Sequence, residues 1–218
     1  MASYFRLTLD TTAPSGVGLT INNGAVYTTS AQVTLAISCS DADKTGYQMK
    51  IWGIDGAASE ATATWETYSA TKTVTLTSGD GNKTVYVKIR DDVYNESASA
   101  YDSITLDTSV PEVTIQSQDV QKISKVSPKN VASIIWNCDV EIVAWKVKVV
   151  DSINASESDG TQIGTTGGST NVSGNTTKSA ETNVTTTIYG ADLEAASAGD
   201  GEKILKIFVQ NAAGSWSN

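Results

Sequence analysis

The chain has 218 residues, which suits one large or two ordinary domains, and its formal net charge is −9 at pH 7. It contains no histidine and only two cysteines. It therefore lacks the residues for histidine-based acid–base catalysis, a four-cysteine zinc site or an iron–sulfur cluster, and we expect no cofactor. The acidic balance argues against duplex nucleic acid and anionic membrane as partners, because both are negatively charged.

The first predicted element is a strand within residues 1–9. This segment has neither the basic region nor the long apolar run of a signal peptide, so we expect no such leader. No apolar run in the sequence approaches the roughly 20 residues of a membrane-spanning helix. Residues 3–10 also align with a later segment, residues 100–107. The matched positions are Tyr4 with Tyr101, Leu7 with Ile104, and Leu9 with Leu106.

An internal repeat organises the rest of the chain. Residues 9–14, Leu-Asp-Thr-Thr-Ala-Pro, return as residues 106–111, Leu-Asp-Thr-Ser-Val-Pro. The turn sequence Gly-Asp-Gly at residues 79–81 returns at residues 199–201. A repeat of this length predicts two domains in tandem, residues 10–107 and residues 108–218.

Both halves contain strands in the same order, with apolar side chains alternating on one face. In the first half the inward residues are Val33, Leu35, Ile37, Cys39, Val74, Leu76, Val85, Val87 and Ile89. In the second half they are Ala132, Ile134, Trp136, Cys138, Leu205, Ile207 and Val209. Residues 47–51 and 145–149 form another matching pair of strands. Short strands between Gly, Asp and Asn clusters predict an all-β sandwich.

Two segments of the second half depart from this pattern. Residues 152–183 are rich in Ser, Thr, Gly and Asn. This composition favours a flexible loop with a short edge strand, and the alternative is a contact loop on the outer surface. Residues 191–196 are expected to form one helical turn.

These landmarks resemble the tandem immunoglobulin-like repeats of bacterial surface proteins and of tailed-phage virion proteins. The matching features are the Asp-Thr-Thr-Ala-Pro junction, the Gly-Asp-Gly turn, the helical turn and the Asn-Ala-Ala-Gly turn at residues 211–214. The resemblance implies an all-β fold with two tandem immunoglobulin-like β-sandwich domains. The chain departs from antibody domains in its cysteines, since Cys39 and Cys138 lie on equivalent strands without a partner. We therefore expect two free thiols.

The comparison of the two halves also predicts an open sandwich edge. The second domain, residues 108–218, has no closing strand of its own, whereas residues 1–9 resemble a spare one. An edge without its closing strand presents unpaired backbone groups. We hypothesise that Tyr4, Leu7 and Leu9 of one copy complete the second domain of a neighbour, or pair with another virion protein. The alternative is that this strand lies on its own first domain.

Surface residues provide two further candidate interaction sites. Lys122, Lys125 and Lys129 form a basic stretch that either blocks pairing at a sheet edge or docks on an acidic partner. Trp52 and Trp65 are candidate surface aromatics that would stack on sugars or anchor a protein interface, whereas core burial is expected for Tyr47 and Trp145.

Paired carboxylates provide no recognisable site. A calcium ion between the domains would have oxygen donors, but these follow no ordered ligand spacing: Asp91, Asp92, Asp107 and Glu112. We expect such Asp residues to support turns through their side-chain acceptors, and we expect no catalytic or metal-binding residues.

The resemblance and the lack of catalytic motifs imply a non-enzymatic structural accessory protein of a tailed-phage virion, assembled in the host cytoplasm. Capsid decoration is the favoured place, with the major capsid protein as partner, and this choice rests on the family resemblance alone. The alternatives are a tail or fibre accessory protein, a carbohydrate-binding or adhesion module that contacts host surface glycans, and a fragment of a bacterial adhesin.

Overall fold

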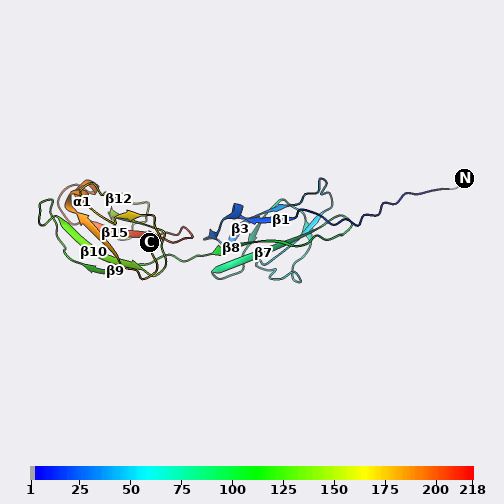
Figure 1. Cartoon of the computed structure of the whole chain (residues 1–218), viewed down its shortest axis with the longest axis horizontal. Helices are drawn as coiled ribbons and strands as arrows, with labels where there is room; N and C mark the ends of the chain where they lie inside the picture. Colours follow the sequence, from blue (N-terminus) through cyan, green and yellow to red (C-terminus); the bar gives the residue numbers. More distant parts are fainter. Residues whose placement is uncertain (1–2) are drawn as a thin grey trace. The chain divides into compact units, whose positions relative to one another are not determined.

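The computed structural model describes residues 3–218 and divides the chain between Thr108 and Ser109 into two compact units (Figure 1). Nearly all of the regular structure is β, as expected from the alternating patterns. Among the described residues, no helix is both long and apolar enough to cross a membrane.

The first unit is a sandwich of two sheets. Its elements are β1 (Gly18–Ile21), η1 (Asn22–Gly24), β2 (Tyr27–Thr28), β3 (Gln32–Ser38), β4 (Gln48–Trp52), β5 (Glu66–Thr67), β6 (Thr71–Thr75), β7 (Gly81–Arg90) and β8 (Ala100–Leu106). One sheet has the order β1-β3-β6, and the other has the order β2-β8-β7-β4-β5. All pairs are antiparallel except that of β2 with β8.

Alternation of apolar and polar residues forms the core of this sandwich. Strand β3 buries every second side chain and exposes the others, so one face of the strand packs inward. Strand β7 from the opposite sheet contributes its own buried row. The expected inward residues of these two strands are confirmed as parts of one core: Val33, Leu35, Ile37, Val85, Val87 and Ile89.

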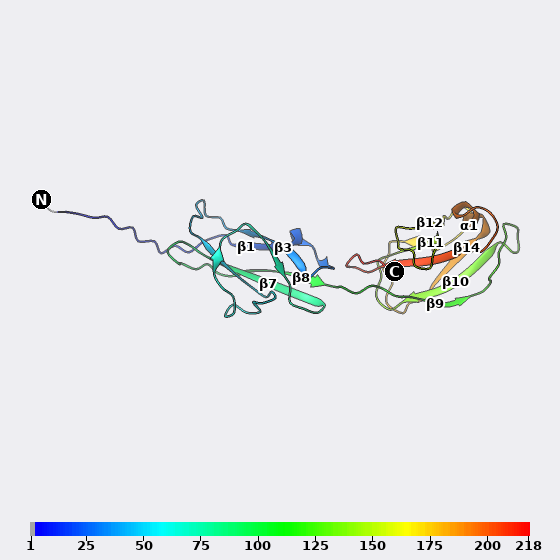
Figure 2. The same cartoon turned by 180° about the vertical axis from the view of Figure 1, so that it is seen from behind.

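Strand β8 closes the first sandwich. It pairs with β7 from Gly81–Leu106 to Val87–Ala100, and Figure 2 shows the two strands side by side. Ile104 and Leu106 point inward and are buried in the core. The first unit is therefore complete on both sides of β7.

The second unit repeats the sandwich with one difference. Its elements are β9 (Val113–Gln118), β10 (Val131–Cys138), β11 (Ala144–Val150), β12 (Thr161–Gln162), β13 (Ser173–Gly174), β14 (Val184–Tyr189), α1 (Gly190–Ala196) and β15 (Ile204–Gln210). One sheet has the order β14-β10-β9. In the other, β11 pairs with β15 on one side and with β12 and β13 on the opposite side. No described strand corresponds to β8.

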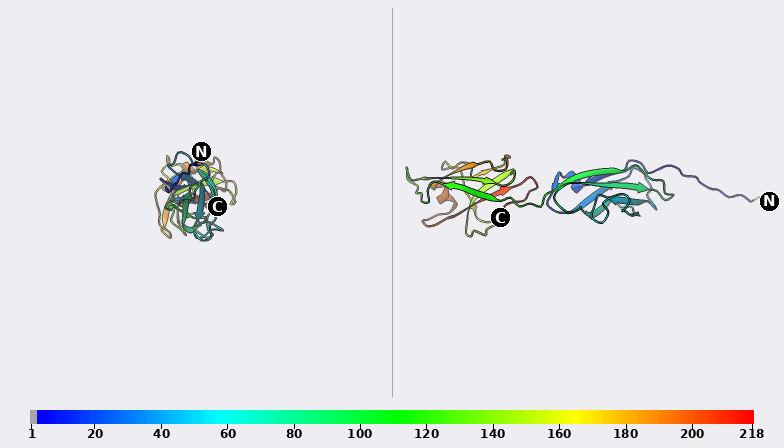
Figure 3. Two further views of the ribbon diagram at one scale, coloured as in Figure 1. Left: turned by 90° about the vertical axis from the view of Figure 1, so that its right-hand side faces the viewer. Right: turned by 90° about the horizontal axis from the view of Figure 1, so that it is seen from below.

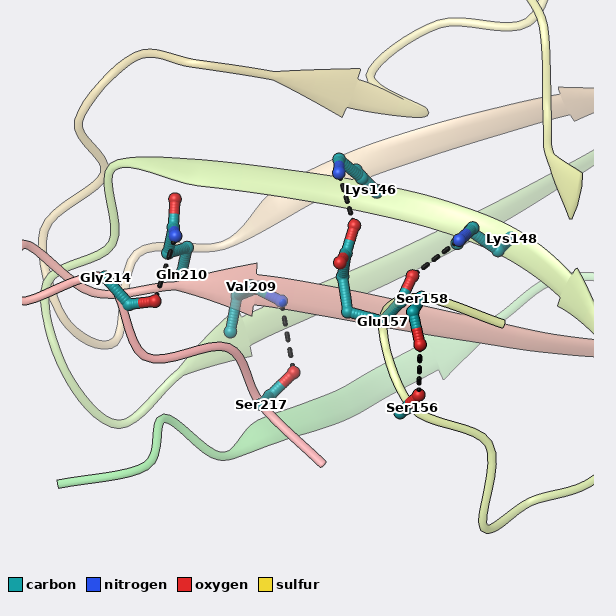
Figure 4. A network of polar contacts seen from close by, with 9 residues as sticks. All are labelled: Lys146, Lys148, Ser156, Glu157, Ser158, Val209, Gln210, Gly214 and Ser217. Atoms are coloured by element: carbon teal, nitrogen blue, oxygen red, sulfur yellow. Dashed lines mark hydrogen bonds and ion pairs between the residues drawn. The ribbon is translucent and has the colours of Figure 1, made fainter. Parts of the chain in front are cut away.

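The long segment 152–183 is packed rather than flexible. It contains β12 and β13, and its Ile163 and Val172 are fully buried in the core of the second unit. The buried Lys148 side chain on β11 donates to the backbone oxygen of Glu157 at 2.5 Å, and Lys146 pairs with the Glu157 carboxylate (Figure 4). The segment therefore covers the edge and outer face of β11, which corrects the expectation of a flexible loop.

The expected helical turn forms α1, and its Asp192 holds the long segment in place. The Asp192 carboxylate is 3% exposed and accepts hydrogen bonds from the N–H groups of Gly167 at 2.6 Å and Ser169 at 2.9 Å. Burial favours the protonated form, but the hydrogen bonds from Ser169 and Gly167 outweigh it and hold the pKa of this carboxyl below its usual value.

Asp192→Asn is expected to destabilise the second unit by about 1–3 kcal/mol at neutral pH, because an amide replaces a charged acceptor. A lowered folded-state pKa means that the stabilisation is present above the unfolded-state pKa and is lost as pH falls through the folded-state pKa. Urea unfolding at neutral and acidic pH measures this, with Glu194→Gln on the same helix as control. A difference between wild type and variant that stays constant with pH would contradict the assignment.

Cys39 and Cys138 are both free thiols, one in each unit. Cys138 is buried and Cys39 is half-buried. Burial is the main cause that raises the pKa of each thiol above its usual value.

We expect both thiols to react slowly with an alkylating reagent in the native protein, because a raised pKa lowers the thiolate fraction. Both are expected to react rapidly after denaturation without a reductant. Mass spectrometry of the alkylated protein counts them. An unreduced, denatured chain that takes up no label would show that a disulfide is present.

Candidate functional site

Strand β15 has an unpaired edge. It pairs with β11 along its whole length, from Val150–Ile204 to Ala144–Gln210. Its counterpart β7 in the first unit has neighbours on both sides, β4 and β8. Within residues 3–218, the other side of β15 has only an isolated bridge between Gln210 and Trp216. Val209 bonds Ser217 through its backbone N–H and C=O, so the part of this edge before Val209 is the part available to an added strand.

A groove lies beside this edge. It has a volume of about 690 Å³ and runs between β9 and β15. The strands of both sheets contribute an apolar part of its lining: Val113, Ile115, Ile134, Val147, Leu205 and Ile207. Polar and charged side chains, including Glu112, Lys203 and Lys206, line the rest. A second hollow of about 1230 Å³ shares Ile134 and Leu205 with it and extends toward α1.

Apolar side chains around the groove are less buried than their counterparts in the first unit. Ile115 on β9 is 53% exposed. Leu205 is half-buried, whereas the equivalent Val85 on β7 is fully buried. In the first unit, the inward side chains of β8 fill the space that corresponds to the groove. The groove therefore lies where a closing strand would pack, and its partly exposed apolar side chains are those that such a strand would cover.

The turn after β15 matches the turn that leads into β8. In the first unit, Ser97 N–H donates to Ile89 O at 2.8 Å, and Ile89 N–H donates to Ser97 Oγ at 3.1 Å. In the second unit, Ser217 N–H donates to Val209 O at 2.8 Å, and Val209 N–H donates to Ser217 Oγ at 3.1 Å (Figure 4). The second unit thus begins the same hairpin at the same place.

The N-terminal segment does not lie on the first unit. Residues 3–10 form no strand or helix, and the N-terminal trace extends away from the first sandwich in Figure 1 and in the right-hand view of Figure 3. Four apolar side chains in this segment are 85–88% exposed: Tyr4, Phe5, Leu7 and Leu9. Contacts with the first sandwich begin at Asp10, whose carbonyl accepts from Asn95 Nδ2–H at 3.3 Å. They continue at the buried Pro14 and at Ser15, whose carbonyl accepts from Ser40 N–H at 2.9 Å. This corrects the alternative in which the segment covers its own first domain.

The basic stretch is a loop rather than an edge strand. Lys122, Lys125 and Lys129 lie between β9 and β10, and all three side chains are exposed. Lys125 Nζ pairs with Glu194 Oε1 on α1 at 3.6 Å, while Lys122 lines the second hollow. The proposal that these lysines block an edge is therefore wrong, and docking on an acidic partner stays a prediction.

Trp52 is not a surface aromatic. It is 9% exposed and stacks on Tyr86 with ring centroids 5.3 Å apart. Tyr86 in turn contacts Tyr101 on β8 at 5.7 Å, and the Tyr101 side chain is 67% exposed. Trp65 is half-buried between two cations, Lys50 and Arg90. Tyr101 is therefore the most exposed ring on the strands of this sheet, ahead of Tyr27 at 43%, and the sequence did not single it out as a surface aromatic.

Among the carboxylates considered for calcium, Asp91 supports a turn. Asp91 is buried and accepts from the backbone N–H groups of Val93 and Asn95. Glu112 N–H donates to Asp139 Oδ1 at 2.8 Å. Across residues 3–218, no three acidic, Cys or His side chains are grouped to hold a metal ion.

No family model and no curated protein matches the chain. Solved structures similar to it include the fibronectin(III)-like modules of CbhA from Clostridium thermocellum, at 10% identity over 92% of this chain and 89% of that chain, with a TM-score of 0.46. The D00-D0 domain of intimin is 13% identical over 93% of this chain and 96% of that chain, with a TM-score of 0.32. The FN1-FN3 domains of chicken CNTN1 are 14% identical over 95% of this chain and 62% of that chain, with a TM-score of 0.36. By its own strand order, the chain is an all-β protein built from β-sandwiches.

Proposed function

We propose that the protein is a non-enzymatic structural module that assembles with other protein chains through the second unit. The observation that carries this proposal is the unpaired edge of β15 beside an apolar groove. An extended segment that adds to such an edge gains backbone hydrogen bonds, and pockets between the sheets take its alternate side chains. Exposed apolar patches of this kind mark interaction sites in soluble proteins.

Within this class, we favour an accessory protein of a tailed-phage virion that assembles in the host cytoplasm and decorates the capsid. The support is the resemblance of the junction and turn sequences to virion immunoglobulin-like repeats. The major capsid protein is the favoured partner, and a tail or fibre position is the alternative. The net charge of −9 disfavours nucleic acid and anionic membrane as partners.

Immunogold electron microscopy tests the place in the virion. Antibodies against the purified chain are applied to particles of the phage whose genome encodes it, and particles from a deletion mutant are the control. Label on capsids is expected. Label confined to tails would show that the protein is a tail component, and particles without label would contradict the virion proposal.

A second candidate function is adhesion to host surface glycans. The observation that favours it is the row Trp52, Tyr86 and Tyr101, which ends in the exposed Tyr101 ring. Planar aromatic rings stack on the apolar faces of sugars. A glycan array that shows binding by the wild type and by Tyr27→Ala, but not by Tyr101→Ala, would support this function. An array without any binding would contradict it.

A further inference from the structure

We propose that the groove of the second unit takes residues 3–10 of a second copy of this chain as its closing strand. The inference rests on the proposed function, because it names the occupant of the same assembly edge. Four features of the chain lead to it: the sequence of the segment, the register it would adopt, the junction that follows it, and its reach.

The first feature is the likeness of the segment to β8. Residues 3–9 match Ala100–Leu106 with apolar residues at equivalent places, and β8 is the strand that completes the first unit. The segment has no strand or helix of its own, and its apolar side chains face solvent. A segment with exposed apolar side chains and a groove without a described closing strand therefore occur in one chain.

The second feature is the register. In the first unit, Ile104 pairs with Lys83 and Leu106 pairs with Gly81. The repeat relates Lys83 to Lys203 and Gly81 to Gly201 through the shared Gly-Asp-Gly turn. The same pairing places Leu7 opposite Lys203 and Leu9 opposite Gly201.

This register divides the segment into two faces. Phe5, Leu7 and Leu9 point into the groove, while Tyr4, Arg6 and Thr8 point outward, because successive side chains of a strand alternate. The counterpart of Tyr4 is the outward Tyr101, so Tyr4 lies outside the core in this arrangement. Phe5 takes the place of Asp102 and brings an aromatic ring to the apolar lining of the groove.

The third feature is the junction that follows the segment. In the first unit, Thr108 N–H and Thr108 Oγ–H both donate to Asp80 Oδ1, at 3.1 and 2.9 Å. The repeat relates Thr108 to Thr11 and Asp80 to Asp200. A donated strand therefore places Thr11 of one copy beside Asp200 of the next, so that the link between copies reproduces the link within the chain.

The fourth feature is the reach of the segment. Ser15 is held next to Ser40, just beyond the end of β3. Leu106 pairs with Thr28 at the opposite end of the same sandwich, where the chain continues toward the second unit. The link from Leu9 to Ser15 reaches at most about 21 Å, whereas β3 itself spans about 23 Å. Leu9 therefore stays at the end of its own first unit that lies opposite to Leu106.

Head-to-tail donation uses different surfaces on the two copies, so it forms open chains or closed rings. Complementation in analytical ultracentrifugation tests it. Leu7→Asp disables the donor and leaves the groove intact, whereas Ile115→Asp disables the groove and leaves the donor intact. Both side chains are more than half exposed in the single chain, so both variants are expected to fold, and circular dichroism checks this.

We expect oligomers of the wild type and of the control Thr8→Asp, whose substitution lies on the outward face. Each of Leu7→Asp and Ile115→Asp alone is expected to be monomeric, with the Kd of association raised about a hundredfold or more. An equal mixture of the two is expected to form dimers, because one intact donor meets one intact groove.

A monomeric wild type, or a mixture that remains monomeric, would overturn the inference. The proposed function has a separate readout, since binding of the chain to virions can be measured with the same variants. A monomeric wild type that binds virions through Ile115 would overturn self-donation and retain the assembly function. A chain that forms the predicted oligomers without labelling any virion would retain self-donation and remove the virion role.

Discussion

Trp136→Ala is expected to unfold the second unit while the first unit keeps its own melting transition. Trp136 is fully buried, its Nε1–H donates to Thr186 Oγ1 at 2.9 Å, and its ring meets Trp145 edge-on at 6.4 Å. Removing a buried Trp side chain costs about 3–5 kcal/mol. That cost approaches the whole stability of many domains, which is about 5–15 kcal/mol. The cores of the two units share no residue, so the damage stays in one of them.

Scanning calorimetry with circular dichroism measures this effect. The control is Trp65→Ala, which removes a half-buried ring from the first unit and is expected to leave the transition of the second unit unchanged. Loss of both transitions in Trp136→Ala would show that the two units fold as one. A second unit that melts as in the wild type would show that Trp136 does not hold its core.

The second large effect is expected from completing the second unit within one chain. A copy of residues 2–10 appended directly after Asn218 places its Ser3 at the position that Ala100 has after Ser97 in the first unit. The appended strand is expected to raise the melting temperature of the second unit by about 10 °C, which corresponds to about 2–3 kcal/mol for a domain of this size. It is also expected to abolish association between copies, because the groove is then occupied from within.

The matched control is the same extended chain with aspartate in place of Leu7 in the appended copy only. This control is expected to keep the melting temperature of the wild type and to associate as the wild type does. If both appended chains melted alike, the groove would not be a strand-binding site.

The sequence predicted the strands well because their physical signal is local. Apolar alternation in Val33, Leu35 and Ile37 appears in the sequence as it does in the sheet. The open edge was also predictable, because it follows from comparing the two repeats rather than from any single residue. The structure adds the groove and the exposure of the N-terminal segment, which depend on packing between strands distant in sequence.

Other features depend on contacts that periodicity does not encode. Ile163 and Val172 lie in a Ser- and Gly-rich segment, yet both are core residues because the segment folds over β11. Trp52 lies on the outer face of its sheet, but Tyr86 on the next strand stacks on it and removes it from the surface. Phe5 was not singled out because its counterpart in β8 is Asp102, and its role follows only from the register of that pairing.

Cysteine cross-linking tests the central claim most directly. The register places Thr8 of one copy opposite Glu202 of another, as Thr105 lies opposite Asn82 in the first unit. Directly opposed residues of two strands fall within the Cα distance that a disulfide requires. A mixture of Thr8→Cys and Glu202→Cys proteins is therefore expected to form a disulfide-linked dimer under mild oxidation. A mixture of Thr8→Cys and Lys129→Cys, where the second thiol lies on an exposed loop away from the groove, is expected to form none. Equal cross-linking in both mixtures, or none in either, would contradict strand donation in the second unit.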